Sequence, residues 1–101
     1  MNISITSRKF KARQSLKDFI NDEMKGLTKY NDRIMNADVI LSYLNSNNSI
    51  KSAEIILHVP GQTLTATEDS DDFEKSVSLA SEKLQRQLQK LKTKRTAVRI
   101  K

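Results

Sequence analysis

The sequence has no cysteine, one histidine and two glycines among its 101 residues. The absence of cysteine excludes disulfide bonds and thiolate metal sites, and it fits a reducing, cytoplasmic compartment. One histidine without cysteine excludes His/Cys metal clusters, and two glycines are too few for the glycine-rich loops that bind nucleotide phosphates. We therefore expect no enzymatic activity, no cofactor and no small-molecule substrate.

Long apolar segments are also missing. No run of eighteen apolar residues occurs, and the N-terminus has no basic segment followed by an apolar one. Membrane spans and secretory signals show these patterns, so we expect neither, and no membrane partner. With 37% hydrophobic residues and one proline, we expect a single globular domain with one modest core.

Acidic residues are absent after Glu82, whereas the last nineteen residues carry eight basic side chains. The first 82 residues hold ten basic and twelve acidic side chains, so the net charge of +6 arises at the C-terminal end. Charge segregated in this way favours a polyanionic partner. An ordinary solvated helix intersperses both signs to gain i,i+4 pairs, so we interpret the basic segment as a nucleic-acid-binding face.

The basic segment has the apolar periodicity of a helix. Its apolar residues recur at steps of three and four: Phe73, Val77, Ala80, Leu84, Leu88 and Leu91. Four cations fall within roughly 80° on one flank of that stripe: Lys83, Arg86, Lys90 and Lys94. Lys92 falls on the opposite flank. Cations about 5–6 Å apart on a rigid helix are suited to a phosphate backbone.

Acidic residues gather before and at the start of this helix: Glu68, Asp69, Asp71, Asp72 and Glu74. Acids at a helix N-terminus and bases at its C-terminus complement the helix dipole, by about 0.3–1 kcal/mol each. Asp71, followed by Glu74, predicts a capping box. No regular ligand spacing is present, so we expect no metal site here.

The rest of the chain predicts a second helix and four strands. Alternating patterns indicate strands at Asn2–Thr6, Val39–Tyr43, Lys51–Val59 and Gln62–Thr67. Apolar residues at helical spacing predict a helix from Ala12 to Tyr30. The order β-α-β-β-β-α indicates an α+β sandwich of two layers, a four-stranded sheet with two helices on one face, because each helix has one apolar stripe to bury.

Three segments of the chain form a recognisable set: L-K-D-F-I-N-D-E-M-K-G-L-T-K-Y-N-D-R-I (residues 16–34), A-E-I-I-L-H-V-P-G (53–61) and E-K-L-Q-R-Q-L-Q-K-L-K-T-K (82–94). They resemble segments of the ribosome hibernation-promoting factors and the related ribosome-associated inhibitor. They occur in the same order and at similar distances as in that family, and the resemblance covers residues 2 to about 95. We divide the chain into a domain of residues 1–95 and a short basic tail of residues 96–101. In this respect the chain resembles the short type of hibernation factor.

The resemblance implies a fold similar to a double-stranded RNA-binding domain. It also implies binding to the small ribosomal subunit, through its 16S-type rRNA, in the channel used by mRNA and tRNAs. Such binding blocks translation and stores idle ribosomes in stationary phase or under stress. We expect a monomer away from the ribosome.

The resemblance implies contacts between rRNA phosphates and two groups of cations. The first lies on the C-terminal helix: Lys83, Arg86, Lys90, Lys92, Lys94 and Arg95. The second lies in the turn after the first strand and around the end of the first helix: Arg8, Lys9, Lys25, Lys29 and Arg33.

Two alternatives remain open at this point. The domain is a generic double-stranded RNA-binding module that uses the same helix, or it is a protein-interaction module that uses the open sheet face. On that face, Ile56 is the expected apolar residue among polar neighbours.

Overall fold

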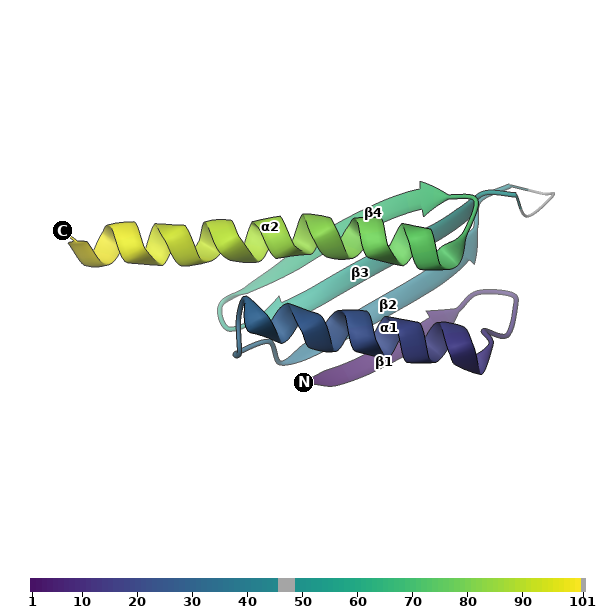
Figure 1. The fold of residues 1–101 in the computed structure, drawn as a ribbon, viewed down its shortest axis with the longest axis horizontal. Helices are drawn as coiled ribbons and strands as arrows, with labels where there is room; N and C mark the ends of the chain where they lie inside the picture. The colour runs from purple at the N-terminus through teal and green to yellow at the C-terminus, as the bar shows by residue number, and fades with distance from the viewer. Residues whose placement is uncertain (46–48, 101) are drawn as a thin grey trace.

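The computed structural model describes residues 1–45 and 49–100, and their side chains as far as Leu91 (Figure 1). Its elements are β1 (Asn2–Ser7), α1 (Gln14–Gly26), the 3₁₀ turn η1 (Leu27–Lys29), β2 (Asn36–Tyr43), β3 (Lys51–Val59), β4 (Gln62–Ser70) and α2 (Phe73–Ile100). The predicted order β-α-β-β-β-α is confirmed.

The four strands form one mixed sheet in the order β1-β2-β3-β4. β1 pairs with β2 in parallel, because α1 carries the chain back across the sheet between them, whereas β2–β3 and β3–β4 are antiparallel. The turn between β3 and β4 contains Pro60 and Gly61. Gly61 has a φ of +85°, a conformation that a residue without a side chain adopts at little cost.

Both helices lie on the same face of the sheet, as predicted (Figure 1). Alternate residues of β2 and β3 turn towards them and are fully buried, among them Val39, Leu41, Ile55 and Leu57. The predicted apolar stripe of α2 packs onto this layer from Phe73 to Leu88. At one end of the core, the rings of Phe10, Tyr43 and Phe73 contact one another with centroids 5.0–5.2 Å apart. The fold is a two-layer α+β sandwich.

The opposite face of the sheet is polar, as predicted, with one correction. Ile56 is not the sole apolar side chain in the middle of this face, because Ile40 of β2 lies on it as well. On the same face, His58 Nε2 lies 3.1 Å from Asp38 Oδ2, and both side chains are about one third exposed.

The structure corrects several predicted boundaries. The first helix begins at Gln14 and gives way to η1 after Gly26, so the predicted helix from Ala12 to Tyr30 is too long at both ends. β2 begins three residues earlier than predicted, because β1 and β3 pair with it from Asn36. β1 and β4 each continue further than predicted, to Ser7 and Ser70.

The start of α2 also differs from the prediction. α2 begins at Phe73, so Asp71 lies too early to act as the predicted cap. The Ser70 hydroxyl instead accepts a hydrogen bond from the backbone amide of Asp72, at 3.2 Å. A serine at the end of β4 therefore shapes the entry into the helix.

Candidate nucleic-acid interface

α1 and α2 run in the same direction over the sheet, so their C-terminal ends lie at the same end of the molecule (Figure 1). The helices contact each other directly, since Ser78 Oγ donates a hydrogen bond of 3.3 Å to Glu23 Oε1. Helix C-termini carry a partial negative charge that favours nearby cations. This arrangement brings the cations at the end of α1 close to the C-terminal half of α2.

Three predicted cations belong to this end of α1: Lys25, Lys29 and Arg33. All three are exposed. Lys29 and Arg33 line a cleft of about 500 Å³ whose other wall includes Leu88 and Leu91 of α2. The structure therefore brings this group close to the basic helix, which begins forty residues after Arg33 in the sequence.

The predicted row on α2 lies on the flank that faces β4. Gln87 Nε2 donates a hydrogen bond of 3.1 Å to the carbonyl oxygen of Thr65, and Lys83 forms an ion pair with Glu68. Arg86 and Lys90 of the same row are exposed. The helical phase predicted from the sequence is consistent with these contacts, but the positive charge of Lys83 is offset by a carboxylate of the protein itself.

The side chains of Lys92, Lys94 and Arg95 lie outside the described part of the chain. The backbone of α2 remains helical to Ile100. At about 1.5 Å per residue, a helix of this length spans about 42 Å, and Figure 1 shows it extending well past the turn between β3 and β4. The assignment of these three cations and the division at residue 95 stay predictions.

Arg8 and Lys9 lie at the other end of the molecule. Both are exposed, and they follow β1 where the chain turns towards the start of α1. The backbone amide of Arg8 bonds to Leu41 near the end of β2, and Lys9 has a φ of +64°. The start of α2, with its acidic residues, lies at this same end (Figure 1). The structure therefore separates Arg8 and Lys9 from the other predicted cations.

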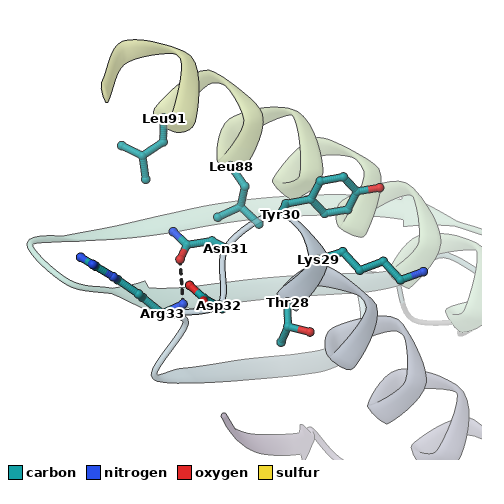
Figure 2. A pocket seen from close by; sticks show the side chains of 8 residues that line it. All are labelled: Thr28, Lys29, Tyr30, Asn31, Asp32, Arg33, Leu88 and Leu91. Atoms are coloured by element: carbon teal, nitrogen blue, oxygen red, sulfur yellow. Dashed lines mark hydrogen bonds between the residues drawn. The ribbon is translucent and has the colours of Figure 1, made fainter. Parts of the chain in front are cut away.

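The cleft between η1 and α2 was not predicted from the sequence. Its lining comes from one continuous segment, Thr28 to Arg33, and from two leucines of α2. Figure 2 shows Leu88 and Leu91 pointing from the helix towards this segment, and Arg33 extending along its open side. Asn31 Oδ1 accepts a hydrogen bond of 2.8 Å from the backbone amide of Arg33, which fixes the turn. In the sequence, the polar residues Asn31 to Arg33 after the first helix indicate an exposed turn. They do not reveal that two leucines of α2 form the other wall of a cleft.

We found no arrangement suited to metal binding among the described residues, where no group of three or more His, Cys, Asp and Glu side chains comes together. None of the helices in the described ranges has both the length and the apolar character that a membrane span requires.

Comparison with known proteins identifies the family. The model of the family described as Sigma 54 modulation protein / S30EA ribosomal protein matches residues 3–96. The chain belongs to this family. The family predicted from the three sequence segments is thereby confirmed.

Two curated relatives show how much of the chain is shared. A ribosome hibernation promoting factor from Azotobacter vinelandii is 29% identical over 94 residues, which make up 93% of this chain and 85% of that protein. A ribosome hibernation promotion factor from Deinococcus radiodurans is 28% identical over 92 residues, 89% of this chain and 48% of that protein. The chain thus spans about half the length of the Deinococcus relative.

Solved structures share the fold. A ribosomal subunit interface protein from Coxiella burnetii superposes with a TM-score of 0.83 at 28% identity, over 92% of this chain and 99% of that one. The N-terminal domain of Protein Y from Thermus thermophilus superposes with a TM-score of 0.80 at 24% identity, over 90% and 99% of the two chains. The second likeness is evidence for the fold alone.

Proposed function

We propose that this protein binds the small ribosomal subunit in the mRNA/tRNA channel, contacts its rRNA, and inhibits translation so that idle ribosomes are stored during stationary phase or stress. The observation that carries the proposal is family membership over residues 3–96. The names of relatives that share most of this chain, hibernation promoting factor and subunit interface protein, support it. A ribosomal partner implies action in the cytoplasm.

The charge distribution supports contact with rRNA. Exposed cations from α1, η1 and α2 gather towards one end of the helical layer, while the acids around Asp71 and Asp72 lie at the opposite end. The opposite end also carries exposed cations, Arg8 and Lys9 among them, so it holds both signs of charge. A polyanion is therefore attracted most strongly to the end where cations predominate, which orients the protein during association. Structured RNA is recognised through phosphates, 2′-hydroxyls and backbone shape, and a rigid basic helix suits these features. No chemical step is needed.

Binding to purified bacterial small subunits, compared with a plain RNA duplex, tests this proposal. Because the chain has no cysteine, Ser4→Cys on the exposed face of β1 provides a single site for a fluorescent dye, far from the helices. We expect the small subunit to bind at least about tenfold more tightly than the duplex, a difference of about 1.4 kcal/mol. Equal affinities would indicate the generic duplex-binding alternative, and absence of subunit binding would contradict the proposal.

A further inference from the structure

The cleft between η1 and α2 combines three kinds of surface. Leu91 contributes apolar surface, and Leu88, which is 1% exposed, closes the cleft behind it. Asn31 contributes an amide, and Lys29 and Arg33 contribute positive charge at the rim, partly balanced by Asp32. Its volume of about 500 Å³ falls within the range of about 300–1,000 Å³ that is typical of small-molecule sites. A ligand that fits has a flat apolar part, a hydrogen-bonding edge and a negative charge.

The orientation of Asn31 supplies the hydrogen-bonding group. Its Oδ1 atom is occupied by the backbone amide of Arg33. An amide whose oxygen is fixed in this way presents its NH₂ group in a defined direction, and that group donates but does not accept. Figure 2 shows the nitrogen on the side of the cleft towards Leu91. Asn31 is therefore set to bind an acceptor atom inside the cleft.

Arg33 supplies a planar surface. A guanidinium group stacks on nucleobases as aromatic rings do, whereas an ammonium group has no planar face. The aromatic side chains of the described residues are largely committed to the core, including Phe73 and the partly buried Tyr30. Arg33 extends along the open side of the cleft opposite Leu91 (Figure 2), so a flat ring between them has a cation on one face and a leucine on the other.

We propose that this cleft binds one unstacked nucleotide of the rRNA, with its base between Arg33 and Leu91 and its edge at the Asn31 amide. Lys29 also lines the cleft, but its side chain extends away from Arg33 and Leu91 (Figure 2), so it is placed for the phosphate of a neighbouring nucleotide. Sequence-specific RNA recognition commonly uses unstacked bases in this way. The inference rests on the proposed function. It adds a site for a base to the cations of α1, η1 and α2, which are suited to bind phosphates.

Two substitutions separate base binding from simple charge attraction. Arg33→Lys retains the cation but loses the stacking plane. Asn31→Asp retains the oxygen that accepts the Arg33 amide but replaces the NH₂ donor with a second acceptor. Arg13→Lys, at the exposed start of α1, and Asn21→Asp, on α1 outside the cleft, are the matched controls for the two chemical changes.

The experiment measures affinity for bacterial small subunits and probes the Watson–Crick edges of rRNA bases with dimethyl sulfate and a carbodiimide at saturating protein. We expect Arg33→Lys to weaken binding about five- to a hundredfold, nearly as much as Arg33→Ala, since stacking one base contributes that much. Arg13→Lys should bind as the wild type does. Asn31→Asp should lose the protection of an unpaired base that the wild type and Asn21→Asp both protect.

The outcomes distinguish this inference from the proposed function. Wild-type affinity in Arg33→Lys, or a footprint of Asn31→Asp that matches that of Asn21→Asp, overturns the nucleotide site while the proposed function stands. Failure of the wild-type protein to bind the small subunit overturns both.

Discussion

Lys83 on α2 forms an ion pair with Glu68 on β4. The Glu68 side chain is 23% exposed and that of Lys83 is 50% exposed, so the pair is partly shielded from solvent. The sequence predicted that Glu68 is one of the acids that complement the dipole at the start of α2. This prediction is wrong, because Glu68 lies within β4 and pairs with Lys83, beyond the first turns of α2. The pair joins the helix to the sheet edge and lowers the charge that the row presents to RNA.

We predict that Glu68→Gln increases affinity for the small subunit. The substitution leaves Lys83 without a carboxylate partner while it preserves the shape of the side chain. A partly exposed pair is worth about 0.2–1 kcal/mol, so we expect a gain of up to about fivefold in affinity at low salt. Glu74→Gln, at the exposed start of α2, changes the net charge equally at the opposite end of the domain and is the control. Equal gains from both variants would contradict a local role for the pair.

The double variant Arg86→Ala with Lys90→Ala should weaken binding without unfolding the domain. Both side chains are exposed, so their removal leaves the buried stripe of α2 intact. Loss of two phosphate contacts should reduce the slope of log K against log salt by about 1.4–1.8. Salt titration of binding measures this slope, and circular dichroism reports the fold. The control is Lys11→Ala with Lys75→Ala, which removes two exposed cations at the other end of the domain. An equal loss of affinity and of salt slope in the control would indicate that net charge, and not the position of Arg86 and Lys90, determines binding.

The two buried serines of α2 should respond in opposite ways to the same substitution. Ser76, fully buried, donates a hydrogen bond of 2.7 Å from Oγ to the carbonyl oxygen of Lys51, and it lies 2.6 Å from Ser70 Oγ. Ser81, 7% exposed, has no hydrogen-bond partner for Oγ among the described residues. Ser76→Ala leaves the partly buried carbonyl of Lys51 without this donor, whereas Ser81→Ala removes a buried hydroxyl that has no hydrogen-bond partner among the described residues.

We therefore expect Ser76→Ala to lower the free energy of unfolding by about 1–3 kcal/mol, and Ser81→Ala to leave it unchanged or raise it by about 1 kcal/mol. Urea denaturation of the two variants beside the wild type measures both effects. Equal destabilisation by the two substitutions would show that Ser81 has a partner in solution.

The position of Arg8 and Lys9 leads to a separate expectation. They lie at the end of the domain that also holds the start of α2 and its acids, away from the cleft. Arg8→Ala should therefore reduce affinity less than Arg33→Ala, although each removes one exposed guanidinium. Equilibrium binding to small subunits compares the two, and a larger loss from Arg8→Ala would contradict the orientation proposed from the charge distribution.

Local patterns predicted the four strands, although the bounds of β1, β2 and β4 needed correction. The bounds of β3 match the prediction, because alternation from Lys51 to Val59 is followed by the strong turn signal of Pro60 and Gly61. The end of α1 was predicted less well, since the apolar spacing continues through Leu27 while the backbone tightens into η1. Helical spacing alone does not distinguish these two conformations.

The candidate site was only partly predictable for a different reason. The phase of the cations on α2 follows from helical geometry, and the exposure of Arg86 and Lys90 agrees with it. The cleft depends on the parallel direction of α1 and α2, which brings Asn31 and Leu88 to the same cavity. The ion pair of Lys83 depends on the side of α2 that faces β4. Neither relationship is encoded in a local sequence pattern.

Competition with tRNA tests the central claim most directly. Wild-type protein is sedimented with bacterial small subunits that are either vacant or occupied by mRNA and tRNA, at low and at high salt. We predict that the protein co-sediments with vacant subunits at low salt, is lost at high salt, and is excluded by bound tRNA. With about four to six phosphates contacted, log K should fall by about three to five per log unit of salt. Undiminished binding to tRNA-occupied subunits would contradict binding in the mRNA/tRNA channel.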